Sequence, residues 1–282
     1  MYIVLIAAGS GGRQRFAFPS RQTSMAVERG LVTSAGLPLD DCIQLAGETD
    51  LDFVEILMGG SGAPKRLNED AQQIQNQLRD HELDCLVHLP FSGIDIGIPY
   101  PHAREGMQAE IDAALRIAGE LNARKAVLHP TSGANTPGQQ RALMAEGVQR
   151  AVETGTVHGV EICAENMFGK YVTINQMDDV LDETDASLTL DTGHARIEGF
   201  YGDDQAAFLE SNADSVSHVH LNDTRGPKDE HLPFGAGMID FDPMFDLIRD
   251  GTWQGSLSLE LYTHDLEYMR YSVTRLDDLL RP

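Results

Sequence analysis

The sequence predicts an α/β fold, a (β/α)8 TIM barrel, from two observations. Short apolar runs rich in β-branched residues alternate eight times with segments of helical periodicity. Six of the short runs also end in a His, Asp or Glu residue. In a parallel α/β barrel the carboxyl ends of the strands share one face, so these six ends can converge on one point. A doubly wound open sheet would not bring six separate strand ends together.

The predicted strands are eight short runs, each followed by enough residues for one helix. They span residues 30–34, 52–57, 84–88, 124–129, 159–165, 187–191, 216–221 and 256–261. One strand and one helix make the repeat unit of a parallel barrel. Eight such units therefore account for most of the chain.

Each strand is followed by a recognisable helix start, where Pro or a small polar or acidic residue caps or pre-sets the first turn. The predicted starts are at residues 37–40, 68–70, 104, 136–137, 173, 203–204, 240 and 264–265. In the third helix, predicted for 104–121, apolar residues repeat at i, i+3, i+4 and i+7. That spacing predicts one buried helix face.

A length of 282 residues suits one large domain with its own core. Residues 1–24 differ from the rest because they carry three Arg and no acidic residue. Their glycine-rich segment 7–13 is superficially similar to a phosphate loop, but no helix pattern follows it. We interpret 1–24 as a flexible or mis-annotated N-terminal extension and 25–282 as a single barrel.

The composition is strongly acidic, with 44 Asp and Glu against 21 Lys and Arg and a net charge of −23. Acidic pairs recur along the whole chain, and only four of the basic residues are Lys. This even spread favours a halophilic protein, adapted to high salt, over a protein with one cationic partner. In molar salt the screening length is about 3 Å, so the charge does not exclude a polyanionic substrate.

The cysteines and the hydropathy predict a cytoplasmic protein. Cys42, Cys85 and Cys163 are odd in number and lack a C-x-x-C pair, which disfavours a disulfide or a thiolate zinc site. No apolar run approaches the roughly 20 residues of a membrane span, so no membrane partner is expected. A homo-oligomer is compatible with the sequence.

Four of the strand-end residues form a candidate ligand set for one divalent metal. They are Glu165, Asp191, His220 and Glu260. Imidazole mixed with carboxylate suits Mn, Zn, Co or Mg rather than an ion that prefers thiolates. Any one of these residues alone would be explained by a loop or surface role, but four in succession favour a metal.

Five further residues stand at or just after strand ends and are candidates for additional metal or substrate binding. They are His88, His129, His194, Asp229 and His231. His88 and His129 could hold a second metal with Glu165 as a bridge, and the other three could hold a third. Hydrogen bonding to a substrate is an equal alternative for each.

Weaker candidates for substrate contacts are Glu55, which ends the second predicted strand, and three basic residues after strand ends. The basic residues are Arg196, Arg225 and Lys228. A structural or solvated role is the competing interpretation for each of the four. We expect His218 to point away from His220, toward the outside or the core.

Together these motifs resemble the xylose isomerase-like barrels, a superfamily that includes sugar phosphate isomerases and epimerases and the endonuclease IV-like AP endonucleases. The resemblance rests on HLPF at 88–91, HP at 129–130, EN at 165–166, DTGH at 191–194, HLND at 220–223, DEHLPFGAG at 229–237 and Glu260. These segments occur in order across residues 30–262.

The epimerase branch implies that Glu165, Asp191, His220 and Glu260 hold one divalent ion. Glu165 and Glu260 would then also be the catalytic acid and base that move a proton through an enediolate of a sugar or sugar phosphate. The nuclease branch implies that all nine residues hold up to three zinc ions and hydrolyse DNA at an abasic site.

The loops favour the isomerase or epimerase. Segment 58–66, MGGSGAPKR, lacks the Asn/Gln, Arg and Trp cluster with which the nuclease penetrates DNA. Segments 88–91 and 165–168 also depart from the nuclease pattern. The zinc-dependent AP endonuclease or phosphodiesterase stays as the alternative, with DNA as its partner. A non-catalytic sugar-binding barrel that keeps a metal for structure is the second alternative.

Overall fold

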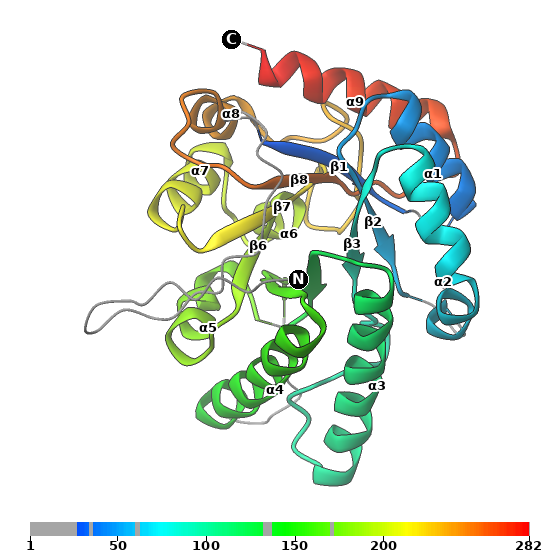
Figure 1. Ribbon diagram of the computed structural model, residues 1–282. Helices are drawn as coiled ribbons and strands as arrows, with labels where there is room; N and C mark the ends of the chain where they lie inside the picture. The colour runs from blue at the N-terminus through cyan, green and yellow to red at the C-terminus, as the bar shows by residue number, and fades with distance from the viewer. Residues whose placement is uncertain (1–26, 34–35, 60–62, 132–136, 170–171, 282) are drawn as a thin grey trace, which may run out of the picture.

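The eight strands of the protein form a closed parallel barrel in the order β1 to β8, surrounded by helices (Figure 1). This computed structural model describes residues 27–33, 36–59, 63–131, 137–169 and 172–281. The predicted (β/α)8 TIM barrel is therefore confirmed. The extension predicted for residues 1–24 lies outside the described residues.

The strands are β1 Glu28–Val32, β2 Phe53–Leu57, β3 Asp84–His88, β4 Lys125–Leu128, β5 Glu161–Glu165, β6 Ser187–Asp191, β7 Val216–Leu221 and β8 Ser256–Leu259. The predicted ranges differ from these by at most two residues at either end. Pairing of β1 with β8 closes the barrel and sets Gly30 opposite Ser258. A Cβ atom on Gly30 would lie 2.3 Å from the ring of Phe53, so only glycine fits there.

The helices on the outside are α1 Leu39–Glu48, α2 Ala63–Asp80, α3 Pro101–Glu120, α4 Pro137–His158, α5 Met177–Glu183, α7 Gly202–Ser211, α8 Asp242–Arg249 and α9 Leu266–Leu280. The 3-10 helix η1, Ile174–Gln176, leads into α5. Helix α2 begins five residues and α3 three residues before the predicted start. Each has a proline in its first two residues, where the missing N–H has no helical partner to lose.

One short helix, α6 Thr192–Ile197, was not predicted. Six residues are too few to show a helical period, so the sequence pattern gives no sign of it. Asp191 caps this helix, and its side chain accepts a hydrogen bond from the backbone N–H of His194 at 2.6 Å. The helix therefore follows directly from a strand end that carries a candidate ligand.

The main core lies between the strands and the helix layer. Val54 and Ile56 of β2 and Ile111 and Leu115 of α3 are buried in this layer. All three cysteines are buried, and they form no disulfide with one another. Burial raises the pKa of the Cys85 thiol to about 12, which keeps it protonated and unreactive.

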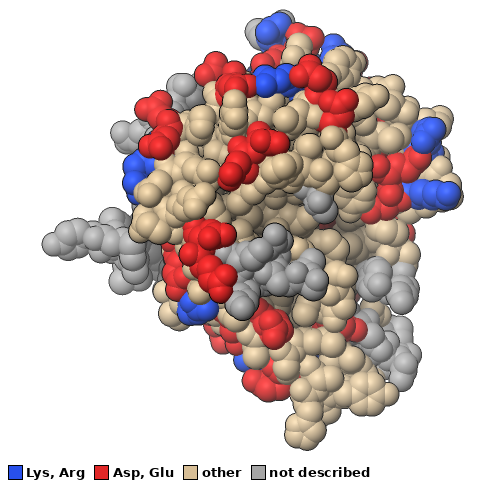
Figure 2. Space-filling view, turned by 90° about the vertical axis from the view of Figure 1, so that its right-hand side faces the viewer, with Lys and Arg blue, Asp and Glu red and all other residues tan. Residues whose placement is uncertain are grey.

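Asp and Glu side chains lie in several separate groups over the face shown in Figure 2, among few Lys and Arg side chains. This agrees with the even spread of acidic residues along the sequence. Among the described helices, none combines the length and apolar character that crossing a bilayer requires.

Candidate metal centre at the carboxyl ends of the strands

The four predicted core ligands meet at one end of the barrel. Glu165 ends β5, Asp191 ends β6, His220 lies near the end of β7, and Glu260 directly follows β8. All four are buried, and one potential ligand atom from each lies within 4.8 Å of the others. His220 Nδ1 is 3.4 Å from Glu165 Oε1 and 3.2 Å from Glu260 Oε2. The barrel thus joins residues that are almost 100 positions apart in sequence.

Several polar atoms of this cluster lack hydrogen-bond partners. Both carboxylate oxygens of Glu165, Nδ1 of His220 and Oε2 of Glu260 are buried and unpartnered. Buried polar atoms are nearly always paired, and an uncompensated buried charge strongly destabilises a fold. A divalent cation bound among these atoms would compensate all of them. The donor set of imidazole and carboxylate therefore fits a divalent metal.

Burial and neighbouring charges shift the pKa values in the cluster. Burial raises the pKa of Asp191 to about 7. Burial also opposes ionisation of Glu260, but the nearby imidazoles of His220 and His231 lower its pKa to about 2. Burial opposes the charge on His220, whereas Glu55, Glu260 and Glu165 raise its pKa well above the ordinary value. Without a metal, protons on the imidazoles compensate the carboxylates.

Two asparagines fix the position of Asp191. The Asn222 amide donates to Asp191 Oδ2 at 2.8 Å, and Asn166 hydrogen-bonds both the backbone N–H and the carbonyl of Asp191. A Cβ atom on Gly193 would lie 2.0 Å from the Asn222 side-chain oxygen, so this close packing requires glycine. Neither asparagine was predicted from the sequence to have a role. The only feature of the sequence that pointed to them was their position directly after the last residue of a strand.

A second cluster joins His88 and His129 to Glu165. Their Nε2 atoms lie 3.5 and 3.1 Å from Glu165 Oε2. His88 Nδ1 is 3.1 Å from the Leu89 carbonyl, so a proton on Nδ1 would leave Nε2 free to face Glu165. This arrangement suits a metal or a substrate oxygen.

A third cluster joins His194, Asp229 and His231. His231 Nε2 lies 2.9 Å from Asp229 Oδ1, and His194 Nε2 lies 3.6 Å from Asp229 Oδ2. The Nδ1 atoms of the two rings face the backbone carbonyls of Asn166 and Glu260. Each ring is therefore held from behind and presents Nε2 to the carboxylate, which is also how metal-binding histidines are held.

Asp223 anchors the loop that carries Asp229 and His231. Its Oδ2 accepts hydrogen bonds from the backbone N–H groups of Gly235 and Gly237 at 3.0 and 2.9 Å. Its Oδ1 accepts from the N–H groups of Thr224 and Ile239. A Cβ atom on Gly237 would lie 2.2 Å from the Asp223 carboxylate. Asp223 thus organises the loop instead of facing the cluster.

A cavity of about 1090 Å³ opens above the three clusters. Phe91, Phe168 and Tyr262 line it, and each ring packs against a cluster histidine. The closest pair is Tyr262 on His231, with ring centroids 3.9 Å apart. Among the described residues that line the cavity, none is Lys or Arg. Apolar walls around a polar floor are typical of a small-molecule site.

The weaker predicted substrate contacts lie elsewhere. Glu55 is fully buried, contacts His220 and is absent from the described lining of the cavity, which favours the structural role given as its alternative. Arg196 stacks on the Tyr201 ring, Arg225 pairs with Glu230, and Lys228 is exposed. The described lining of the cavity includes none of these three basic residues. Their roles in binding stay predictions.

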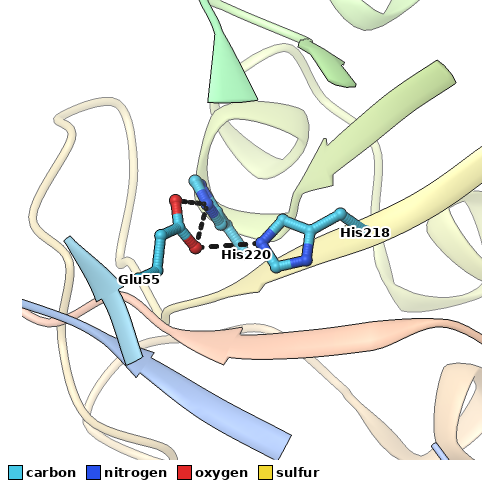
Figure 3. Close-up of side chains that lie close together, drawn as sticks. All are labelled: Glu55, His218 and His220. Atoms are coloured by element: carbon cyan, nitrogen blue, oxygen red, sulfur yellow. Dashed lines mark hydrogen bonds and ion pairs between the residues drawn. The ribbon is translucent and has the colours of Figure 1, made fainter. Parts of the chain in front are cut away.

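The expected orientation of His218 was wrong. His218 and His220 both point into the barrel and both contact the Glu55 carboxylate, at 3.0 Å each (Figure 3). Side chains alternate along a strand, so residues two positions apart share a face. The spacing in the sequence therefore carried this information.

Residues 43–279 match the family described as xylose isomerase-like TIM barrel. An uncharacterized protein of Methanocaldococcus jannaschii is 26% identical over 79% of this chain and 78% of its own length. An inosose dehydratase of Clostridium beijerinckii is 28% identical, over 42% of this chain and 46% of the dehydratase.

Solved structures with the same fold include sugar epimerases. A D-tagatose 3-epimerase-like protein superposes with a TM-score of 0.78 at 23% identity, covering 90% of this chain and 97% of that one. D-psicose 3-epimerase of Clostridium cellulolyticum H10, in a crystal structure with D-tagatose, superposes at 0.74 with 15% identity, covering 90% and 98%. From the family match over residues 43–279 and the closed eight-stranded barrel, the chain belongs to the xylose isomerase-like TIM barrel family.

Proposed function

We propose that the protein is a divalent-metal-dependent isomerase or epimerase of sugars. The observation that carries this proposal is the pair of buried carboxylates, Glu165 and Glu260, on either side of His220 Nδ1 at the floor of the cavity. Both oxygens of Glu165 and Oε2 of Glu260 lack hydrogen-bond partners in a place where a substrate can enter. The epimerases and the inosose dehydratase among similar proteins support a sugar as substrate.

Glu165, Asp191, His220 and Glu260 would hold the ion. When bound, a divalent metal polarises a carbonyl and its neighbouring hydroxyl and so acidifies the adjacent C–H. Glu165 and Glu260 would then act as base and acid, one taking a proton from the substrate carbon and the other, in its protonated form, supplying a proton to the enediolate. The enediolate formed in between explains how both isomerisation and epimerisation can follow from one site.

The cavity favours an unphosphorylated sugar. Its described lining contains no Lys or Arg to bind a phosphate, whereas Phe91, Phe168 and Tyr262 offer apolar rings to the C–H face of a sugar. Imidazoles and carboxylates on the floor can exchange hydrogen bonds with several hydroxyl groups. A ketose or an inosose fits this chemistry.

Solvent exchange tests the proposal directly. The protein, loaded with Mn²⁺, Co²⁺, Zn²⁺ or Mg²⁺ in high salt, is incubated in deuterated water with D-tagatose, D-psicose, D-fructose and an inosose. We expect deuterium to enter the carbon next to the carbonyl of at least one sugar, and EDTA to stop this. Absence of exchange with every metal and sugar would contradict the proposal, and sugar binding without exchange would indicate a non-catalytic barrel.

A second function is favoured by one specific observation, the grouping of all nine candidate ligands into three adjoining clusters. Such a grouping could hold up to three zinc ions and hydrolyse a phosphodiester, as in an AP endonuclease. Metal analysis separates the two functions, because the isomerase predicts about one ion per chain and the nuclease about three. Incision of a duplex with an abasic site would favour the nuclease.

A further inference from the structure

A line of hydrogen bonds runs through the barrel interior below the metal-ligand cluster. It begins at Lys125, the first residue of β4, whose ammonium donates to Ser256 Oγ at 3.0 Å. Ser256 Oγ lies 2.6 Å from His218 Nδ1, and His218 Nε2 lies 3.0 Å from Glu55 Oε2. Glu55 Oε1 lies 3.0 Å from His220 Nε2. The line therefore connects the amino end of β4 to a candidate metal ligand, and Figure 3 shows its last three members.

The chemistry of these groups gives the line a direction. A protonated lysine only donates hydrogen bonds, so Ser256 accepts from Lys125 and its own O–H can donate to His218 Nδ1. His218 then carries its proton on Nε2 and donates it to Glu55. A carboxylate only accepts, so His220 must also donate from Nε2.

The direction decides which nitrogen of His220 is available to a metal. With the proton on Nε2, a neutral imidazole has its lone pair on Nδ1. Nδ1 is the atom that lies 3.2 Å from Glu260 Oε2 and has no hydrogen-bond partner. Metal-binding histidines commonly donate their other N–H to a carboxylate, which fixes the tautomer and the ring orientation.

Glu55, His218 and His220 are close enough to one another to bind an ion of their own, but their bonding argues against it. Glu55 Oε2 accepts from Ser258 at 2.7 Å as well as from His218, and Oε1 faces His220. The unpartnered carboxylate oxygens among the described residues include both of Glu165 and none of Glu55. Glu55 is therefore already saturated by donors.

We propose that Glu55 and His218 are positioning residues that hold His220 in the tautomer with a free Nδ1, and that Lys125 sets the direction of the line. This inference rests on the proposed function, because it takes His220 to be a metal ligand. Lys125 would then act on the metal centre although it lies at the opposite end of the barrel strands.

The variant Glu55→Gln tests the inference. A glutamine keeps only one acceptor oxygen, places an amide donor beside the histidines and removes the negative charge that favours a proton on His220 Nε2, so the preference for this tautomer is weakened. We expect Mn²⁺ alone to bind about 10–100-fold more weakly, measured by competition with a chelating dye. The matched control is Glu161→Gln on β5, which keeps an acceptor for the Ser187 hydroxyl and should bind Mn²⁺ like the unaltered protein.

Two further measurements separate positioning from general support of the fold. In the Zn²⁺-saturated protein, the Nε2–H of His220 should exchange slowly and give a ring N–H signal by NMR, which Glu55→Gln loses. Glu55→Gln should also reduce the rise in Tm caused by the metal. A residue that only supported the fold would lower the Tm of the metal-free and the loaded protein equally.

The variant Lys125→Met gives an independent test if Glu55→Gln does not fold. It keeps the aliphatic stem but removes the donor, so Ser256 is free to reorient, and we expect about fivefold weaker Mn²⁺ binding. If the unaltered protein binds no divalent ion, the proposed function itself fails. If it binds, while each variant that folds binds Mn²⁺ as tightly as the unaltered protein and keeps the full rise in Tm, only the positioning role is overturned.

Discussion

The two sides of the His220 ring show opposite uses of a buried glutamate. Glu55, below the ring, faces three donors, and both of its oxygens are satisfied. Glu165, above the ring, is equally buried, but its two oxygens have no hydrogen-bond partner. Because both are charged groups removed from water, the difference lies in their partners. A saturated carboxylate stabilises the position of its neighbours, whereas an unsaturated one is available to a metal or a substrate.

The largest expected effect sharpens this comparison at Glu165. Glu165→Gln keeps the size of the side chain but removes a charge that proton transfer and metal binding both need. We expect solvent exchange of the substrate proton to fall by about 10²–10⁴-fold. Deuterium uptake by NMR measures it, with Glu153→Gln on the exposed face of α4 as a control. Full activity of Glu165→Gln would show that the missing partners at this site have no role in catalysis.

The next effect concerns the loop above the cluster, which Asp223 anchors through four backbone N–H groups. Asp223→Asn leaves one acceptor oxygen and turns an amide donor toward N–H groups. We expect a loss of about 3 kcal/mol in the free energy of unfolding, measured in urea. Asp214→Asn, before β7, is the exposed control. Equal stability of the two variants would mean that the loop does not depend on this carboxylate.

A smaller loss is expected on the saturated side. Ser258→Ala removes one donor to Glu55 but leaves both histidines in place. Because the lost hydrogen bond reaches a charged group, we expect about 2 kcal/mol less stability. Thermal and urea unfolding measure this loss. A neutral result would indicate that Glu55 is not saturated by its protein donors, and would weaken the contrast with Glu165.

The stability of the metal-free protein should also depend on pH. The pKa of Asp191 is raised from 3.8 to about 7 because of burial. Burial opposes the charge on His231, but Glu260 and Asp229 raise its pKa from 6.5 to about 9. A group whose pKa is raised by folding stabilises the fold at pH values below its pKa in the unfolded chain. This stabilisation is lost as the pH rises through its pKa in the folded protein.

We therefore expect the Tm of the metal-free protein to fall as pH rises from 5 to 9. Asp191 contributes to this fall up to about pH 7, and His231 contributes between 6.5 and about 9. A bound divalent ion replaces the protons, so the metal-loaded protein should lose less Tm over the same range. A Tm that rises from pH 5 to 9 without metal would contradict these shifts.

Most residues of the candidate metal centre could be predicted from the sequence, because strand ends are local features. The motifs around Glu165, Asp191 and His220 each follow an apolar run, and a closed parallel barrel leaves them only one face to occupy. The roles of Asn166 and Asn222 were missed, since they depend on hydrogen bonds across β5, β6 and β7. The orientation of His218 was predictable from strand alternation alone, and the prediction misapplied that rule.

The sequence by itself determined the barrel, its strand order and the residues that meet at its mouth, because hydrophobic period and chain connectivity are properties of a linear pattern. Only the tertiary structure decided that Glu55 lies beneath His220 and not in the cavity. Likewise, only the tertiary structure showed that the Glu165 oxygens lack hydrogen-bond partners while the Glu55 oxygens have them. These distinctions depend on which side chains from distant strands face one another, and no local pattern in the sequence records that.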